Sequence, residues 1–355
     1  MIHPLIFCPS IEGGGVEKNL FLISNFLSQK VDKVYLLTAN KDMKSKFNKK
    51  IIFISPKSNY WSNKNRILKS LICFFLFFKL KKKFLVISFQ SNILAIIISK
   101  IFNYKIIIRS NTSPEKYIKN NIKKIIFKFF FKMANEIVVN SYSFKNSLNK
   151  MLGLKSIVIY NPTKKVKINK INKIKNTIHI INVGRLTDQK NQLLLLSAVK
   201  ELSKKIKWKL SIIGKGNNYR KISDFINKNN LKKKINLYGY KKNSIKEIYK
   251  SDLFILTSNY EGLPNVLIEA QQVGTPIIST NCKTGPKEIL LNGKLGELIP
   301  VGNKPILVKK IEDFYFNRKK YIKKSNLAKK YLYRFDYNKN CNLYYNLFKK
   351  YLYEK

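Results

Sequence analysis

Two acidic residues, Glu261 and Glu269, lie close together in the sequence with seven residues between them. The apolar run Leu253–Thr257 before them is typical of a buried strand in a parallel sheet. Pro264 suits the first turn of a helix, so we expect Glu261 on the loop after the strand and Glu269 inside the helix. Ligands of open α/β sheets bind at this edge, and free N–H groups at a helix start attract phosphate. Because the chain has only 19 acidic residues against 70 basic ones, we expect this pair to serve chemistry rather than solubility.

Two cations precede another predicted helix. A strand predicted over Thr177–Val183 is followed by Arg185 and Lys190, just before the apolar run Leu193–Leu196. Cations at a helix start oppose the helix dipole, which favours anions at that end. An anion such as diphosphate between the two side chains would remove this conflict. A plain surface position in a lysine-rich protein is the alternative for Lys190 alone.

Glycine turns join predicted strands to helices at two further places. The loop Gly13–Gly15 follows a strand over Pro4–Cys8, and Gly214 follows a strand over Lys209–Ile213. Glycine lets backbone N–H groups approach a phosphate closely. The first loop does not match the Gly-x-Gly-x-x-Gly fingerprint, so a dinucleotide site is only weakly indicated, and a tight turn without a ligand is the alternative.

Short apolar runs alternate with helix-length segments along the chain, which predicts parallel, doubly wound α/β sheets. The other predicted strands are Val34–Thr38, Ile51–Ser55, Phe84–Ser88, Lys105–Arg109, Glu136–Asn140, Ser156–Tyr160, Ile235–Tyr238 and Pro276–Ser279. The lysine-rich stretch Lys164–Lys175 is typical of a linker. At 355 residues we therefore expect two domains, residues 1–165 and 166–335, followed by a C-terminal helical segment, residues 336–355.

The formal charge of +51 is the most unusual compositional feature. Because the lysines are spread along the whole chain, a polyanion partner and a general compositional bias explain this charge equally well. The chain has no RNA-recognition signature, zinc-finger spacing or basic zipper, so no nucleic acid partner is expected. Its four cysteines are far apart and match no metal spacing, which suggests a reducing compartment.

Two segments combine apolar residues with lysines, Asn65–Lys83 and Lys119–Met133. They are either interfacial helices that lie on anionic lipid or core-facing helices with a solvated rim. The most apolar run, Leu71–Phe78, is far shorter than the roughly 20 residues needed to span a bilayer. The N-terminal segment lacks the basic region and cleavage site of a signal peptide. We expect a cytoplasmic protein, with the cytoplasmic face of the inner membrane as the alternative location.

Taken together, these motifs resemble the retaining glycosyltransferases of the GT-B fold, in particular glycosyltransferase family 4. Glu261 and Glu269, with Gly-Leu-Pro-Asn-Val between them, resemble the E-x7-E motif of that family. Further motifs follow the family's order over most of the chain: Asn-Pro, then Gly-Arg-Leu, then Gly-Pro-Lys-Glu-Ile. The resemblance implies two Rossmann-like domains facing across a cleft, with the C-terminal helix crossing back to the first domain.

The resemblance also implies roles for individual residues. Arg185 and Lys190 would bind the donor diphosphate and, with Glu261, form the catalytic set; Glu261 would hold sugar hydroxyls and Glu269 the ribose hydroxyls. The remaining donor-binding residues implied are Gly14, Gly15, Gly214, Tyr240, Gly262, Leu263, Pro264, Asn265 and Val266. Tyr240 would stack on the nucleotide base, although a packing role is equally expected among 20 tyrosines. Arg109 and Asn111 would lie beside the acceptor and the transferred sugar, in a loop where several relatives carry a histidine and this chain does not.

The implied reaction moves a sugar from a nucleotide sugar, a UDP-sugar in our expectation, to a glycan or lipid-linked acceptor in lipopolysaccharide or capsule biosynthesis. Negative charge grows on the leaving diphosphate, so the enzyme needs preorganised cations and N–H groups. The chain has no Asp-x-Asp sequence, so we expect no metal and no other cofactor, with Arg185 and Lys190 in the metal's place. Front-face attack and double displacement both stay open. The alternatives are a nucleotide-sugar 2-epimerase of the same fold and a non-catalytic, basic membrane-binding protein.

Overall fold

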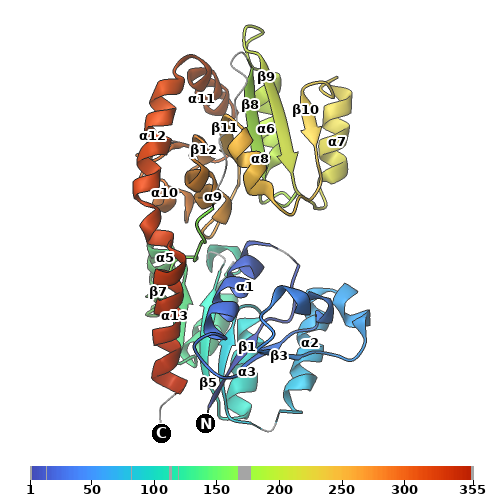
Figure 1. Cartoon of the computed structure of the whole chain (residues 1–355), viewed down its shortest axis with the longest axis vertical. Coiled ribbons are helices and arrows are strands. Elements are labelled where there is room, and N and C mark those ends of the chain that lie inside the picture. Colours follow the sequence, from blue (N-terminus) through green and yellow to red (C-terminus); the bar gives the residue numbers. More distant parts are fainter. Residues whose placement is uncertain are drawn as a thin grey trace. The chain divides into compact units, whose positions relative to one another are not determined.

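Two separate parallel sheets organise the computed structural model (Figure 1). The structure describes residues 2–12, 14–80, 82–111, 114–118, 120–166 and 177–352. The chain divides into two compact units, Met1–Thr163 with Phe335–Lys355, and Lys164–Arg334. The linker predicted over Lys164–Lys175 lies, from residue 167 onward, outside the described residues.

The first unit contains a seven-stranded sheet in the order β3-β2-β1-β4-β5-β6-β7, with every pair parallel. Its strands are β1 (His3–Phe7), β2 (Val34–Leu37), β3 (Ile51–Ile54), β4 (Phe84–Ser88), β5 (Lys105–Ser110), β6 (Glu136–Val139) and β7 (Ile157–Val158). The central strands are buried along most of their length and are largely apolar because helices cover both faces of the sheet. Leu5 and Phe7 face one core and Ile6 faces the other, as the two-residue period of a strand requires.

Helices cover the two faces of this sheet unequally. On the face of Leu5 and Phe7 lie α2 (Arg66–Phe77), α3 (Asn92–Ile101), α4 (Asn121–Lys132) and α5 (Tyr142–Leu152). On the face of Ile6 lie α1 (Gly15–Leu27) and the C-terminal helix α13 (Tyr337–Leu352). Three short 3-10 helices complete the unit, η1 (Lys41–Lys46), η2 (Asn59–Asn63) and η3 (Pro114–Lys116).

The C-terminal helix is part of the first unit, as predicted. Tyr344 of α13 packs in the same core as Leu20 of α1. Its hydroxyl accepts a 2.8 Å hydrogen bond from Nε of Arg109, at the end of β5. A second nitrogen of Arg109 donates to Oδ1 of Asn161 at 2.6 Å. The buried guanidinium therefore joins the sheet to the last helix of the chain.

The second unit contains a six-stranded parallel sheet in the order β10-β9-β8-β11-β12-β13. Its strands are β8 (Ile178–Val183), β9 (Trp208–Ile213), β10 (Ile235–Leu237), β11 (Leu253–Leu256), β12 (Ile277–Thr280) and β13 (Glu297–Ile299). Its helices are α6 (Gln192–Lys200), α7 (Tyr219–Lys228), α8 (Ser244–Lys250), α9 (Asn265–Val273), α10 (Pro286–Ile289), α11 (Lys304–Phe316) and α12 (Arg318–Lys330), and the 3-10 helix η4 (Leu332–Phe335) follows. The strand order with central β8 gives two wound halves, which confirms the predicted pair of Rossmann-like sheets.

The edge strand β13 was not predicted from the sequence. It is three residues long and begins with Glu297, a residue that is rare inside a buried strand. The carboxylate of Glu297 is buried because two lysines neutralise it, Lys324 at 2.5 Å and Lys310 at 2.7 Å. Burial alone would raise the pKa of Glu297, but its bonds with Lys310 and Lys324 outweigh burial and lower that pKa.

Among the described residues, no helix combines the length and the apolar character that crossing a bilayer requires.

Candidate functional site

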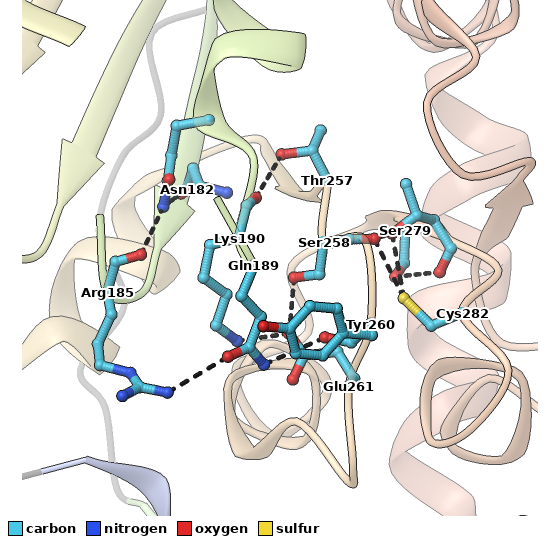
Figure 2. Close-up of polar contacts among 12 residues, drawn as sticks. Asn182, Arg185, Gln189, Lys190, Thr257, Ser258, Tyr260, Glu261, Ser279 and Cys282 are labelled. Carbon is cyan, nitrogen blue, oxygen red and sulfur yellow. Dashed lines mark hydrogen bonds and ion pairs between the residues drawn. The ribbon is translucent and has the colours of Figure 1, made fainter. Parts of the chain in front are cut away.

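The loops after β8 and β11 meet at one edge of the second sheet (Figure 2). These two strands are neighbours, so their carboxyl ends lie side by side. The loop after β8 contains Arg185, Gln189 and Lys190 and leads into α6. The loop after β11 contains Ser258 and Glu261 and leads into α9. The site predicted from the sequence is therefore assembled from two loops that lie about 70 residues apart along the chain.

A buried ion pair joins the two loops. Nζ of Lys190 lies 2.5 Å from Oε1 of Glu261, and the two side chains are 12% and 6% exposed. The hydroxyl of Ser258 donates a 2.6 Å hydrogen bond to the same carboxylate oxygen. Figure 2 shows both groups converging on Glu261. One carboxylate oxygen thus has two donors, which fixes the positive charge of Lys190 at the edge of the sheet.

Side chains also fix the main chain on both sides of this ion pair. Thr257 donates from Oγ1 to the carbonyl of Lys190 at 3.1 Å. Thr284, from the loop before α10, donates from Oγ1 to the carbonyl of Glu261 at 2.5 Å. The backbone of both ion-pair partners is thus held in place by hydroxyl groups, and the pair is preorganised.

Arg185 is exposed, in contrast to Lys190. Its Nη2 donates to Oε1 of Gln189 at 3.3 Å. Gln189 in turn donates from Nε2 to the carbonyl of Tyr260 at 3.1 Å, beside Glu261. The guanidinium reaches the same loop through this amide, as Figure 2 shows. Within the described part of the chain Arg185 forms no ion pair, so its guanidinium can bind an incoming anion without first breaking one.

Close contacts between glycines bring a third loop to the site. A Cβ on Gly214, after β9, would lie 1.8 Å from the carbonyl oxygen of Gly184, after β8. A Cβ on Gly184 would lie 3.4 Å from the Lys190 side chain. The loops after β8 and β9 are therefore packed as closely as backbone allows, and only glycine fits at position 214.

The loop of Tyr240 is hydrogen-bonded to Gly214. The amide of Gly214 donates to the carbonyl of Gly239 at 2.8 Å. The Tyr240 ring is 55% exposed, and the ammonium of Lys215 lies 5.7 Å from its centre. The ring is thus an exposed aromatic surface next to the glycine turn, and its contact with a nucleotide base stays a prediction.

The helix α9 begins at Asn265, four residues after Glu261. Pro264 occupies the N-cap, one residue before the first helical turn where the sequence had placed it. Leu263, Asn265 and Glu269 are buried, each less than 10% exposed. Gly262 is held closely against Gly285, whose Cβ, if present, would lie 1.8 Å from the Gly262 carbonyl oxygen. The start of α9, with its N–H groups, therefore lies beside the ion pair.

The family follows from a match over more than half of the chain. A family model described as glycosyl transferases group 1 matches residues 163–349, which include the whole ion-pair site. The chain belongs to this glycosyltransferase family. The predicted membership in glycosyltransferase family 4 is thereby confirmed.

Individual relatives agree with this family. An uncharacterized glycosyltransferase of Methanocaldococcus jannaschii is 36% identical over 222 residues. The match covers 56% of this chain and only 55% of the length of that relative. The "N-acetylgalactosamine-N,N'-diacetylbacillosaminyl-diphospho-undecaprenol 4-alpha-N-acetylgalactosaminyltransferase" of Campylobacter jejuni is 29% identical over 325 residues, 84% of this chain and 86% of that protein. Among solved structures, HepE of Anabaena in complex with UDP-glucose has a TM-score of 0.78 at 15% identity, over 99% of this chain and 100% of that chain. This last likeness shows the GT-B fold.

Four residues predicted for the glycosyltransferase site lie in the first unit. Gly14 is the N-cap of α1 and Gly15 its first residue, while Gly13 lies outside the described residues. Arg109 is 2% exposed and bound to Tyr344 and Asn161, and Asn111 donates from Nδ2 to the carbonyl of Phe89 at 3.0 Å. The side chain of Arg109 thus serves the packing of its own unit. The donor-side role of the glycines and the acceptor-side role of Arg109 and Asn111 stay predictions.

Sequence reasoning missed the uncharged residues of the glycosyltransferase site. Ser258, Thr284 and Gln189 hold the charged groups, but serine, threonine and glutamine in loops are too common to be singled out. A weak signal did exist for two of them: Ser258 directly follows the buried strand run, and Thr284 stands next to the Gly-Pro that opens α10.

Cys282 lies near this site, and its thiol is buried. Burial raises the pKa of its thiol to about 11. Its sulfur donates to the carbonyl of Ser258 at 3.1 Å, so the thiol supports the loop after β11. Among the described residues, no three His, Cys, Asp or Glu side chains are grouped so that they could hold a metal ion.

Proposed function

We propose that this chain is a retaining glycosyltransferase that moves a hexose from a UDP-sugar to a glycan or lipid-linked acceptor in lipopolysaccharide or capsule biosynthesis. The observation that carries the proposal is the Lys190–Glu261 ion pair, with exposed Arg185 beside it, at the carboxyl ends of β8 and β11. Ligands of open α/β sheets bind at this edge. Both signs of charge are needed there, positive for a diphosphate and negative for sugar hydroxyls.

Cleavage of the bond to the anomeric carbon leaves negative charge on the diphosphate. Arg185 binds and stabilises this charge directly, and Lys190 binds it on the other side. The N–H groups at the start of α9 add partial positive charge at the same place. Since these groups are held before the donor arrives, little reorganisation is needed as the bond breaks. In this proposal the two cations supply the charge that a metal ion supplies in other transferases.

The two glutamates divide the remaining contacts with the donor. Glu261, with one oxygen engaged by Lys190 and Ser258, accepts hydrogen bonds from sugar hydroxyls through its other oxygen. Glu269, buried on α9, accepts from the ribose hydroxyls. In the front-face route the leaving phosphate takes the proton of the acceptor hydroxyl, so no separate protein base is needed.

The donor and acceptor classes are supported by the relatives. HepE was solved with UDP-glucose, and the name of the Campylobacter jejuni relative describes an acceptor carried on diphospho-undecaprenol. The four cysteines, Cys8, Cys73, Cys282 and Cys341, are buried and form no disulfide, which fits a cytoplasmic enzyme in a reducing compartment.

An activity assay with and without an acceptor tests this function. The purified chain is incubated with UDP-glucose, UDP-galactose and their N-acetylated forms, in the presence of EDTA and an undecaprenyl-diphosphate-linked glycan. The proposal predicts UDP release that needs the acceptor and a product with the donor's anomeric configuration, read by NMR. Conversion of the donor to its 2-epimer without an acceptor would contradict the transferase proposal in favour of an epimerase. Transfer that requires an added metal would contradict the role given to Arg185 and Lys190.

A further inference from the structure

Two helices of the first unit expose apolar stripes to solvent. In α4 the side chains of Ile122, Ile125, Ile126 and Phe129 are 69%, 67%, 42% and 62% exposed. Their spacing of three and four residues places them on one face of the helix. Phe131, the one α4 residue buried in the core, lies on the opposite face. The helix therefore has two apolar faces, and only the face of Phe131 is used by the fold.

The helix α2 shows the same arrangement. Cys73 and Phe77 pack in the core of the first unit. Ile67, Leu71 and Phe75 are 72%, 45% and 61% exposed and are spaced four residues apart, so they lie on one outer face of the helix. Phe78, just after the helix, extends this stripe and is 52% exposed.

The two stripes belong to one layer of the unit. The helix α3 packs against both α2 and α4, and all three cover the same face of the sheet. At the end of α3, Ile101 is 59% exposed as well. Most monomeric proteins expose apolar residues singly, whereas this helical layer exposes several aliphatic and aromatic side chains. We call this surface, made of the exposed apolar residues of α2, α3 and α4 with Phe78, the apolar face.

Lysines accompany the apolar face along both helices. The sequence from residue 43 to 114 contains no aspartate or glutamate, and neither does the sequence from 116 to 135. On α4 the lysines Lys123, Lys124, Lys128 and Lys132 are all exposed. After α2, Lys79, Lys82 and Lys83 are exposed as well. Glu12 pairs with Arg66 at the start of α2 at 3.0 Å, but the charged residues of α2 and α4 themselves are all cations, unlike a surface on which acids and bases alternate.

The apolar face and its lysines together favour one kind of partner. A second copy of the chain would bring two lysine-rich surfaces together, and like charges disfavour that contact. An anionic bilayer offers negative headgroups for the lysines and an acyl boundary for Ile125 and Phe129. We propose that the apolar face docks the first unit on an anionic lipid surface, with α2 and α4 lying in the plane of the interface. The proposal concerns the first unit only and does not depend on the donor site of the second.

Vesicle co-sedimentation of the full chain tests the docking. Vesicles of phosphatidylcholine alone are compared with vesicles that also contain phosphatidylglycerol. The stripe variant combines Ile125→Ser with Phe129→Ser, and its control is Phe316→Ser, an equally exposed phenylalanine of α11 in the second unit. The charge variant combines Lys124→Glu with Lys128→Glu, and its control combines Lys204→Glu with Lys205→Glu, exposed lysines of the second unit.

The wild type is expected to sediment with the anionic vesicles and not with the neutral ones. Both α4 variants are expected to lose about tenfold or more of this binding, while both controls retain it. Equal loss in the variants and their controls, or equal binding to both vesicles, would overturn the proposal. So would an absence of vesicle binding combined with self-association in analytical ultracentrifugation that Ile125→Ser with Phe129→Ser abolishes, because the apolar face would then bind a second copy.

Discussion

Lys190 and Glu261, 71 residues apart in the sequence, form an ion pair with a separation of 2.5 Å at the meeting point of two loops. The carboxylate is also bound by Ser258, and neither partner is more than 12% exposed. The pair therefore neutralises itself inside the protein.

Removing one partner of this ion pair is expected to destabilise the protein. Lys190→Ala should lower the free energy of unfolding by about 3 kcal/mol, because it leaves the Glu261 carboxylate buried with only Ser258 as a partner. The matched control is Lys200→Ala, at the exposed end of α6, with an expected change within about 0.5 kcal/mol. Urea unfolding followed by circular dichroism measures both. Equal effects of the two substitutions would mean that the ion pair adds nothing to stability.

The two glutamates are expected to differ in which part of the donor they bind. Glu261→Gln should weaken binding of the UDP-sugar but leave binding of UDP nearly unchanged, and should lower kcat/KM about a hundredfold. Glu269→Gln should weaken the binding of UDP and of the UDP-sugar by the same factor, because both ligands contain the ribose. Calorimetric titration with the two ligands distinguishes the substitutions. The reverse pattern, with Glu261→Gln acting on UDP, would exchange the two roles.

Gly214 is expected to accept no side chain. In Gly214→Ala the new Cβ would meet the Gly184 carbonyl oxygen at 1.8 Å, so the loops after β8 and β9 must separate. We expect a loss of about 3 kcal/mol in unfolding free energy. The control Gly302→Ala has φ of +76° but nothing within 4 Å of its Cβ, and should cost about 1 kcal/mol. Thermal unfolding of both variants checks the difference; a cost for Gly214→Ala no larger than that of the control would argue against close loop packing.

Glu297 is expected to make stability depend on acid pH. Its pKa is lowered in the folded protein because Lys310 and Lys324 outweigh the opposing effect of burial. A carboxylate with a lowered folded pKa stabilises the protein above its unfolded pKa of about 4.3, and this contribution disappears as the pH falls through the folded pKa. Glu297→Gln should therefore lose more stability at neutral pH than in acid. Urea unfolding at pH values on both sides of that range measures the effect, and a deficit that does not depend on pH would contradict it.

The sequence predicted the strands well because buried parallel strands are short, uninterrupted apolar runs. The runs Phe84–Ser88 and Leu253–Thr257 correspond to β4 and to β11, which ends one residue earlier. Strand ends depend on where the neighbouring strand stops, which local sequence does not contain. The strand β13 was missed for a related reason: Glu297 is buried only because lysines of α11 and α12 reach it.

Side-chain direction was harder to predict than position. The sequence placed Arg109 at the end of a strand, which is correct, but its guanidinium turns into the core and binds Tyr344, 235 residues away. The segments of α2 and α4 left two interpretations open, a core-facing helix and an interfacial one. Phe77 and Phe131 are buried, as in a core-facing helix, while the opposite stripes are exposed, and their contact with lipid stays a prediction. A single hydrophobic pattern does not reveal that a helix has two apolar faces.

The central claim, that Arg185 and Lys190 form a donor diphosphate site, is tested most directly by calorimetric titration with UDP and GDP in the absence of metal. The wild type is compared with Arg185→Ala, whose exposed side chain is bound by Gln189, and with the control Arg318→Ala on α12. We expect micromolar binding of UDP, a loss of about tenfold to a hundredfold in Arg185→Ala, and no change in the control. Wild-type protein that is folded but binds neither nucleotide, or UDP binding that Arg185→Ala leaves intact, would contradict the donor site.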